Sequence, residues 1–330
     1  MLNTDNPYFV SVFIPVYNGS DTLKECISSV LSQDMPKGVK LELIIIDSGS
    51  KDGSVEIIKS FSDKRIVFKE IKNSDFGHGK TRQMGAEMAK GRYILFLTQD
   101  ATPMTNRWLI NMIEPFLLNS NIGCVFGRQV PRPNAAATIK REVAFSFASL
   151  GPTDSLMVHR WESLVDNKKT NQLNSFFSDV NSAVRKDLVI SNVPFRDVRY
   201  AEDQGMGEDM QRKGYMKAYT PIGAVWHSND YTAREYYKRK FDEYIGIQET
   251  LGVKYAPSEK LLLLGWVRPT LLDIKFIWQD KEYGPRRKII WWIKSPFYNI
   301  ANQRGRYYAS KMISDQNARD KNSLESSLKS

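Results

Sequence analysis

Polar side chains follow three apolar segments of this sequence, at the point where each segment ends. An aromatic ring there could stack on a nucleobase, and a carboxylate could accept a hydrogen bond from the imide N–H of a pyrimidine. Either residue type alone is more often a turn or helix cap, but three such segment ends together favour a nucleotide site. The residues are Pro15, Tyr17 and Asn18 after the first segment, Asp47 and Ser48 after the second, and Gln99 and Asp100 after the third.

Asp100 directly follows the apolar run Tyr93 to Leu97, which is typical of a buried strand. A charge at such a place is costly unless it is paired or bound to a metal. Carboxylate oxygens are ligands of Mg²⁺ and Mn²⁺, and either ion would neutralise a leaving diphosphate. Asp100 is therefore a candidate ligand for a divalent metal.

A glycine-rich turn at residues 76–82 opens a predicted helix. Its backbone N–H groups, that of Gly79 included, and the guanidinium of Arg82 could face phosphate. His78 could donate to phosphate or could equally stabilise the turn. The turn has neither the P-loop spacing nor the dinucleotide fingerprint, which argues against both of those nucleotide-binding classes.

The first half of the chain alternates short β-rich runs with amphipathic stretches, which is typical of a parallel sheet covered by helices. In such sheets ligands bind beyond the carboxyl ends of the strands, where the polar residues above would lie. Strands are predicted at 10–16, 41–46, 66–71, 93–97 and 122–126, and helices at 21–32, 54–61, 79–89 and 108–118.

Composition indicates a globular cytoplasmic protein. Of 330 residues, 42% are hydrophobic and 25% charged, which argues against wholesale disorder. The two cysteines, Cys26 and Cys124, have no metal-like spacing and suit a reducing compartment. The first residues lack the features of a secretory signal, and the longest apolar run, Leu261 to Val267, is too short to span a bilayer.

The positive charge is concentrated in the last hundred residues. The whole chain carries +10, and residues 231–330 hold 19 Lys/Arg against 11 Asp/Glu, a net +8. This excess of positive charge predicts an anionic partner, either nucleic acid or an acidic membrane surface, unless the basic face is merely solvated. The cluster Arg286 to Lys288 beside Trp291 and Trp292 suits the headgroup region of a membrane, although both rings could instead pack internally.

The predicted organisation has three parts. Residues 1–245 form the nucleotide-binding and catalytic domain, 246–314 a helical basic and aromatic region, and 315–330 a polar tail expected to be disordered. A homo-oligomer is left open.

The chain resembles the inverting glycosyltransferases of family 2, which have the GT-A fold, in five segments that keep the family's order and spacing. The resemblance covers residues 8–245 and implies an α/β fold, with a Rossmann-like, mostly parallel sheet flanked by helices. The segments are Ile14-Pro-Val-Tyr-Asn18, Ile45-Ile-Asp-Ser-Gly-Ser-Lys-Asp-Gly53, Leu95-Phe-Leu-Thr-Gln-Asp100, Ala201-Glu-Asp203 and Ala224-Val-Trp-His227.

This resemblance implies a role for each motif. It places the metal-binding aspartate of the family's D-x-D motif at Asp100, with His227 near the metal or the diphosphate, and the catalytic base at Asp203. Thr98 stands where the family has the first aspartate of D-x-D, which weakens the implied geometry of nucleotide and metal. The residues implied to hold the nucleoside are Tyr17, Asn18, Asp47 and Ser48.

A closer likeness is to the bacterial rhamnosyltransferases of this family, including those that build streptococcal rhamnose polysaccharides. Its marks are Gly77 to Arg82, Thr98 to Ala101, Phe176 to Arg185, Pro194-Phe195 leading to Ala201 to Gln204, and His227 to Tyr231. It implies a dTDP-L-rhamnose donor and a lipid-linked saccharide acceptor, used at the inner face of the membrane. The residues expected to bind the nucleotide sugar are Pro15, Tyr17, Asn18, Asp47, Ser48, His78, Gly79, Arg82, Gln99, Asp100, Asp179 and Arg185.

Inversion at an anomeric carbon needs one carboxylate that takes the proton of the incoming hydroxyl. Glu202 and Asp203 are adjacent in sequence, and neighbouring residues do not face the same way, so one of them is structural. The resemblance favours Asp203 as the base and keeps Glu202 in reserve.

Three alternatives stay open at this point. Related enzymes carry other hexoses, such as those of UDP-GlcNAc, UDP-Gal or UDP-Glc, on similar motifs. A nucleotidyltransferase would share the sheet and the metal carboxylate, but Ile14 to Asn18 contains no Lys or Arg to hold a triphosphate. A nucleic-acid-binding protein would share the basic charge, but no helix-turn-helix, zinc or RNP signature is present, so nucleic acid is not a predicted partner.

Overall fold

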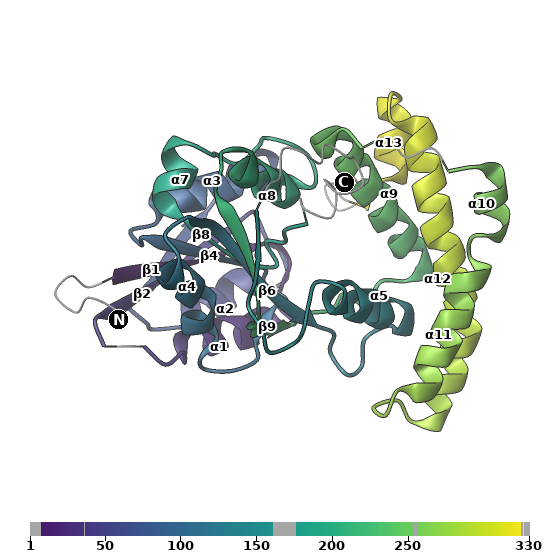
Figure 1. Cartoon of the computed structure of the whole chain (residues 1–330), viewed down its shortest axis with the longest axis horizontal. Coiled ribbons are helices and arrows are strands. Elements are labelled where there is room, and N and C mark those ends of the chain that lie inside the picture. Colours follow the sequence, from purple (N-terminus) through teal and green to yellow (C-terminus); the bar gives the residue numbers. More distant parts are fainter. Residues whose placement is uncertain (1–7, 36, 161–175, 254–256, 325, 327–330) are drawn as a thin grey trace. The chain divides into compact units, whose positions relative to one another are not determined.

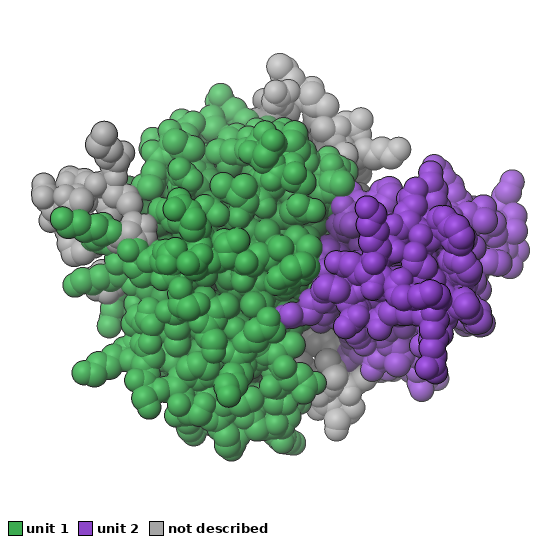
Figure 2. Space-filling model, turned by 90° about the horizontal axis from the view of Figure 1, so that it is seen from below, with its two compact units in different colours: residues 1–130, 147–227 green, residues 131–146, 228–330 purple. Residues whose placement is uncertain are grey.

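The chain folds into two compact units, coloured differently in Figure 2. Unit 1 comprises Met1–Val130 and Phe147–His227, and unit 2 comprises Pro131–Ser146 and Ser228–Ser330. The computed structural model describes residues 8–35, 37–160, 176–253, 257–324 and 326.

Unit 1 contains the strands and half of the helices shown in Figure 1. Its strands are β1 (Tyr8–Val16), β2 (Val39–Asp47), β3 (Ile66–Glu70), β4 (Tyr93–Leu97), β5 (Thr102–Pro103), β6 (Ile122–Val130), β7 (Met157–His159), β8 (Asn181–Arg185) and β9 (Met216–Trp226). Its helices are α1 (Leu23–Leu31), α2 (Ser54–Ser60), the 3₁₀ turn η1 (Asn73–Asp75), α3 (His78–Met88), α4 (Trp108–Leu118), α7 (Lys186–Ser191) and α8 (Glu202–Arg212).

The strands form one mixed sheet in the order β3-β2-β1-β4-β8-β6-β9-β5, with β7 pairing β9. Strands β3, β2, β1 and β4 are parallel, so their carboxyl ends meet at one edge. Strand β8 runs antiparallel between β4 and β6, and β9 is parallel to β6. The predicted α/β sheet with helices on its faces is confirmed, and the strands expected from the first half are all present.

Strands β1, β2 and β4 form because their apolar residues are covered on both faces of the sheet. In β2, every residue except Lys40 is buried. Helices α1 and α4 contribute their buried residues to one hydrophobic core with one face of the sheet. On the other face α3 packs so closely that a Cβ on Gly85 would lie 2.4 Å from the ring of Phe13. This rigid layer fixes the strand ends relative to α3.

Unit 2 is helical. Its helices are α5 (Ala137–Ala148), α9 (Ala233–Leu251), α10 (Glu259–Leu264), α11 (Val267–Gln279), α12 (Pro285–Met312) and α13 (Gln316–Asn322). They share a core that includes Tyr236, Ile277 and Trp291. Thr232 begins α9 with a capping box, because its side chain accepts from the Glu235 N–H and the Glu235 carboxylate accepts from the Thr232 N–H.

The units do not follow the boundaries expected from the sequence. The segment 131–146 belongs to unit 2 although it lies between two strands of unit 1 in the chain, and unit 2 resumes at Ser228 rather than near residue 245. Residues 316–322 of the tail form α13, which Asp315 caps by accepting from the Ala318 N–H at 3.0 Å. Residue 325 and residues 327–330 of that tail lie outside the described residues. Across the described ranges, none of the helices combines the length and apolar character that crossing a bilayer requires.

Candidate active site

Asp47 ends β2 with one carboxylate oxygen satisfied and the other not. Its Oδ1 accepts from the backbone N–H groups of Gly49 and Ser50, both at 2.9 Å. Its Oδ2 is buried and finds no hydrogen-bond partner within the described part of the chain. Leaving a buried polar atom unpaired costs about 1–3 kcal/mol, so a donor on a ligand would gain by meeting it. Beside it, the Ser48 hydroxyl donates to the carbonyl of Val16 at 3.0 Å and joins β2 to β1.

Gln99 holds the turn that follows β1. Its Oε1 accepts from the Tyr17 N–H at 2.8 Å, and its Nε2 donates to the Tyr17 carbonyl at 3.0 Å. Gly19 makes room for this amide, since a Cβ there would lie 2.5 Å from the Gln99 side chain. Asn18 has φ of 48° and accepts from the Lys51 N–H at 2.9 Å. The amides of Gln99 and Asn18 are thus used to shape the loop, while the half-buried ring of Tyr17 stands at the strand end.

Asp100 and His227 meet because β5 pairs with the end of β9, with Thr102 opposite Trp226. His227 Nε2 lies 3.4 Å from Asp100 Oδ2. Burial would raise the pKa of Asp100, but the charge of His227 and hydrogen bonds outweigh it and hold the pKa at about 2. Asp100 Oδ1 and His227 Nδ1 are buried without partners among the described residues.

These orphaned atoms suit a divalent cation only in part. No group of three or more His, Cys, Asp or Glu in the described ranges is placed to hold a metal ion. Mg²⁺ is commonly bound by one or two protein ligands, with phosphate oxygens and water completing its coordination. An ionised carboxylate and an imidazole that face each other fit that arrangement, provided that the diphosphate supplies the remaining ligands.

A second group of charges surrounds Arg82 on α3. Its Nε lies 2.9 Å from Asp179 Oδ2, and its Nη1 lies 2.9 Å from Glu202 Oε1. Asp203 Oδ2 accepts from the Asp179 N–H at 3.3 Å. The Thr98 N–H donates to the carbonyl of Val180 at 3.3 Å, so this carboxylate group adjoins the strand end that carries Asp100.

Three carboxylates around one guanidinium cannot all ionise easily. Burial raises the pKa of Asp203 to about 7; the charge of Glu202 adds to this shift and that of Arg82 opposes it. Burial likewise raises the pKa of Asp179 to about 7, against the effect of Arg82 and with that of Asp203. The Arg82 pKa is raised, because the carboxylates outweigh its own desolvation. A carboxylate that titrates near neutral pH is suited to general base catalysis.

Glu202 and Asp203 differ in exposure. Glu202 is 5% exposed and is held by Arg82, whereas Asp203 is half-buried. Both begin α8, where the helix dipole favours negative charge. Ala201 precedes them with φ of 62°, a conformation that is uncommon outside glycine and that aims the first turn. Glu202 is thus the more buried of the two and is engaged by Arg82, whereas the Asp203 side chain is the more exposed one.

Three of the predicted site residues lie elsewhere or serve packing. Arg185 pairs in register with Tyr93 at the opposite end of β4, where it binds Asp187 at 2.6 Å. Gly79 lets α3 approach the backbone, since a Cβ would lie 2.0 Å from the carbonyl oxygen of Arg196. The His78 ring packs between the rings of Phe76 and Tyr200.

Two features of the site were not expected from the sequence. Arg82, expected at phosphate, is 6% exposed and engaged by carboxylates. Asp52 fixes the loop after β2, because it accepts from the Ser20 N–H at 2.9 Å and from the Ser54 hydroxyl at 2.6 Å. Asp52 also accepts from the Ser54 N–H at 3.1 Å, and an aspartate that bonds the backbone two residues on is a turn signal that could have identified this anchor.

Sequence comparisons identify the family of this chain and two similar proteins. Residues 11–191 match the profile described as glycosyl transferase family 2. The O-antigen chain rhamnosyltransferase RfbN of Salmonella typhimurium is 30% identical over 236 residues, which cover 71% of this chain and 70% of that protein. The O-antigen chain rhamnosyltransferase WbaN of Salmonella anatum is 29% identical and covers 70% of each chain.

Solved structures share the fold. The mannosyltransferase PcManGT from Pyrobaculum calidifontis, in complex with GDP-Man and Mn2+, superposes with a TM-score of 0.59 at 15% identity, covering 94% of this chain and 87% of that one. Residues 1–349 of S. aureus TarS, in complex with UDP-GlcNAc, superpose with a TM-score of 0.53 at 14% identity, covering 92% and 90%. At these identities the likeness is one of fold, and the fold is GT-A.

The raised pKa of Asp203 predicts a pH-dependent gain of stability in Asp203→Asn. In the folded state this carboxyl holds its proton up to about pH 7, whereas in the unfolded chain it ionises near its ordinary value of 3.8. The contribution of this carboxyl to the free energy of unfolding is therefore fully present below about pH 4 and is lost as the pH rises through 7. Asparagine does not ionise, so the free energy of unfolding of the variant should rise relative to the parent between pH 5 and 8, on the order of 1 kcal/mol.

The measurement is urea unfolding of both proteins at pH 5, 6, 7 and 8. Asp63→Asn is the matched control, because hydrogen bonds from Arg65 lower the pKa of Asp63, which does not titrate in this range. The free energy of unfolding of Asp63→Asn should differ from that of the parent by the same amount at every pH. A constant difference for Asp203→Asn as well would mean that Asp203 ionises as an ordinary carboxyl, contrary to the prediction.

Proposed function

Because this chain belongs to glycosyl transferase family 2 and is therefore a glycosyltransferase, we propose that its site transfers L-rhamnose from dTDP-β-L-rhamnose to a hydroxyl of a lipid-linked saccharide, with inversion. The observation that carries the choice of sugar is the 30% identity over 236 residues to an O-antigen chain rhamnosyltransferase. UDP-linked hexoses are the alternative donors. The product would be an α-L-rhamnoside, because inversion of a β-linked donor gives the α configuration.

The nucleoside would lie at the ends of β1 and β2. Asp47 Oδ2, which has no hydrogen-bond partner among the described residues, would accept the imide N–H of thymine, and the ring of Tyr17 would stack on the base. The backbone N–H and the hydroxyl of Ser48 both donate to the Val16 carbonyl, so Ser48 would support the strand end rather than contact the base through its side chain. Pro15 and Asn18 would act similarly, by shaping the strand end.

The diphosphate would reach the Asp100–His227 pair. Asp100 Oδ1 and His227 Nδ1 are the orphaned atoms that would meet a divalent cation, Mg²⁺ or Mn²⁺. A cation bound there would neutralise the negative charge that develops on the departing diphosphate. The family's first D-x-D aspartate is absent here, because Thr98 occupies its position.

Asp203 would act as the base in a single displacement. The acceptor oxygen attacks the anomeric carbon as the bond from that carbon to the diphosphate oxygen breaks, and the hydroxyl proton passes to the Asp203 carboxylate. Arg82, Asp179 and Glu202 would hold Asp203 and tune its pKa without contacting the sugar. A carboxylate whose pKa is raised by burial is a stronger base than an ordinary carboxylate, which suits it to take the proton.

The acceptor side is proposed from the relatives. Their names specify O-antigen chains, and a lipid-linked saccharide of that kind would bring this enzyme to the cytoplasmic face of a membrane. The enzyme would associate with that membrane peripherally.

The donor test compares nucleotides and nucleotide sugars on the purified protein. We expect dTDP with Mn²⁺ to raise the melting temperature more than UDP or GDP, since a ligand that binds only the folded state stabilises it. Radiolabel should pass from dTDP-L-rhamnose to an acceptor or, slowly, to water. Turnover with UDP-sugars but none with dTDP-L-rhamnose would reject rhamnose and leave the glycosyltransferase assignment intact.

We expect Asp203→Asn to reduce turnover by about 10²–10⁴-fold and to leave dTDP affinity nearly unchanged, because the amide cannot take a proton. Glu202→Gln is the matched variant. It removes the charge that faces Arg82, so it should lower stability while keeping turnover within about ten-fold of the parent. If Asp203→Asn stayed within a few-fold and Glu202→Gln did not, the roles of the two residues would be reversed.

Asp100→Ala should abolish the extra stabilisation that Mn²⁺ adds to dTDP binding, because the cation would lose its carboxylate ligand. When Mn²⁺ is present at 100 times its dissociation constant, its binding stabilises the folded protein by about 2.7 kcal/mol, and this stabilisation would be lost. His227→Ala should give a milder loss, since histidine is one ligand among several. Unchanged Mn²⁺-dependent stabilisation in Asp100→Ala, or full activity in EDTA, would reject the metal site.

A further inference from the structure

The surface of unit 2 carries a concentration of exposed apolar side chains. Of the eighteen large hydrophobic residues that are exposed in the described part of the chain, eleven lie between residues 263 and 297. Monomeric proteins seldom leave such a contiguous group uncovered. The eleven are Leu263, Leu264, Val267, Leu271, Leu272, Ile274, Trp278, Ile289, Ile290, Ile293 and Phe297.

Helical spacing arranges these residues in stripes. On α11, four of them recur at intervals of four, three and four residues from Val267 to Trp278, while Thr270, Asp273 and Ile277 are buried on another face. On α12, Ile289, Ile293 and Phe297 share a face in the same way. Both helices thus carry apolar residues on an exposed side as well as in the core of unit 2.

The two stripes meet. The ring of Trp278 on α11 stacks on that of Trp292 on α12, with centroids 6.0 Å apart. Trp292 is one turn from Ile289, and the side of α11 that carries Trp278 is also the side that carries the stripe. Helices α11 and α12 run beside each other, with α10 adjacent to α12 (Figure 1). We call the eleven residues and the surface between them the α10–α12 face.

Basic side chains flank the α10–α12 face. Between residues 259 and 297 the exposed basic residues are Lys260, Arg268, Lys275, Lys281, Arg286 and Lys294. The exposed acidic residues there are Glu259 and Glu282, and Glu282 binds Lys140 at 2.5 Å. The face therefore combines apolar anchors with an excess of positive charge, which is the composition of helices that lie in the interface of an anionic bilayer.

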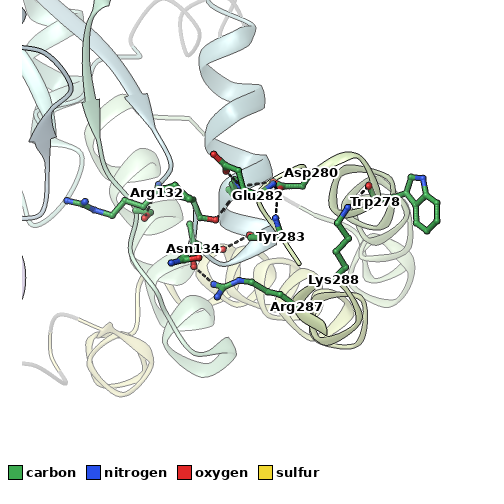
Figure 3. Close-up of polar contacts among 12 residues, drawn as sticks. Arg132, Asn134, Trp278, Asp280, Glu282, Tyr283, Arg287 and Lys288 are labelled. Atoms are coloured by element: carbon green, nitrogen blue, oxygen red, sulfur yellow. Dashed lines mark hydrogen bonds and ion pairs between the residues drawn. The ribbon is translucent and has the colours of Figure 1, made fainter. Parts of the chain in front are cut away.

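Of the residues that the sequence proposed for this role, Arg286 is exposed but Trp291 is not. Trp291 is 7% exposed and belongs to the core of unit 2, so its prediction as a membrane anchor is wrong. Figure 3 shows that Arg287 reaches the backbone carbonyl of Asn134 and that Lys288 reaches that of Trp278. In the same view the Trp278 indole points away from this network, and the indole is 69% exposed.

We propose that the α10–α12 face binds the surface of an anionic phospholipid bilayer, with Trp278, Ile293 and Phe297 entering the headgroup region. The aliphatic and aromatic side chains supply apolar area, and the flanking Lys and Arg residues bind lipid phosphates. This proposal goes beyond the proposed transfer reaction. It relies on that reaction only for the reason that an acceptor held by a lipid would give such docking a use.

Charge favours a bilayer over a second copy of the chain. A two-fold dimer would place the same patch against itself. Six exposed basic residues would then face six others, and like charges across an interface are costly. An anionic bilayer instead complements both the apolar and the basic parts of the face.

The test is co-sedimentation of the full chain with vesicles of phosphatidylcholine alone and of phosphatidylcholine mixed with phosphatidylglycerol. We expect binding to the anionic vesicles to exceed binding to the neutral ones by about ten-fold or more at low salt, and to weaken as salt is added. The triple variant Trp278→Ser, Ile293→Ser and Phe297→Ser should bind anionic vesicles about ten-fold more weakly than the parent. Lys275→Gln, Arg286→Gln and Lys294→Gln together should remove the preference for anionic lipid.

Matched controls change exposed residues of the same types in unit 1. Leu118→Ser, Ile190→Ser and Ile222→Ser replace exposed apolar residues, and Lys24→Gln, Lys69→Gln and Lys213→Gln replace exposed lysines. Both sets should bind vesicles within about two-fold of the parent. A cooperative thermal unfolding transition near that of the parent verifies that each variant is folded. Because neither this control nor the vesicle assay uses a donor nucleotide, failure of the docking proposal is separate from failure of the proposed reaction.

Two outcomes would overturn the proposal. One is equal sedimentation of the parent and the serine triple variant with anionic vesicles. The other is a parent that light scattering shows to be a dimer, and that becomes a monomer in the serine variant while neither protein binds vesicles. The second result would make the α10–α12 face an interface between copies of this chain.

Discussion

The buried ion cluster around Arg82 is the constraint on which the arrangement of unit 1 depends. One guanidinium on α3 holds carboxylates from the segment before β8 and from the start of α8, both at 2.9 Å. Removing Arg82 would leave buried carboxylates without a counter-charge, which costs about 3–5 kcal/mol. The cluster therefore fixes α3 and α8 to the sheet. Burial, together with the excess of carboxylates over the cation, raises the pKa of both Asp179 and Asp203.

At the strand ends, polar side chains form hydrogen bonds with the backbone, and a few of their atoms have no hydrogen-bond partner. Gln99 uses both ends of its amide on Tyr17, and Asp47 uses one oxygen on the turn after β2. The remaining oxygen of Asp47, together with Asp100 Oδ1 and His227 Nδ1, is buried without a partner among the described residues. Side chains held by such hydrogen bonds are preorganised, and preorganisation lowers the entropy lost when a ligand binds.

In unit 2 a cluster of polar side chains around Asp273 fixes the helices relative to one another. Asp273 is fully buried and accepts from Thr138 on α5 at 2.8 Å and from Ser295 and Asn299 on α12, each at 2.6 Å. These bonds turn one face of α11 inward. The apolar stripe of α11 is consequently held outward, where water would otherwise be expected to disfavour it. Helix α11 therefore buries Thr270 and Asp273 beside Ile277 and leaves its apolar stripe exposed.

The sequence by itself determined the strands of the first half, the residues at their ends and the family. Periodicity and apolar runs depend on neighbours along the chain, so β1, β2 and β4 and the positions of Tyr17, Asp47 and Asp100 could be predicted directly. The strands β8 and β9 were not predicted, because the less regular second half gives a weaker signal. Tertiary structure alone decided which partners these residues have. It placed Arg82 among carboxylates rather than at phosphate, carried Arg185 to the far end of β8, and buried Trp291 while exposing Trp278. Local spacing shows which residues share a face, whereas contacts between elements distant in the chain depend on how the elements pack, and that packing is settled only when the whole core forms.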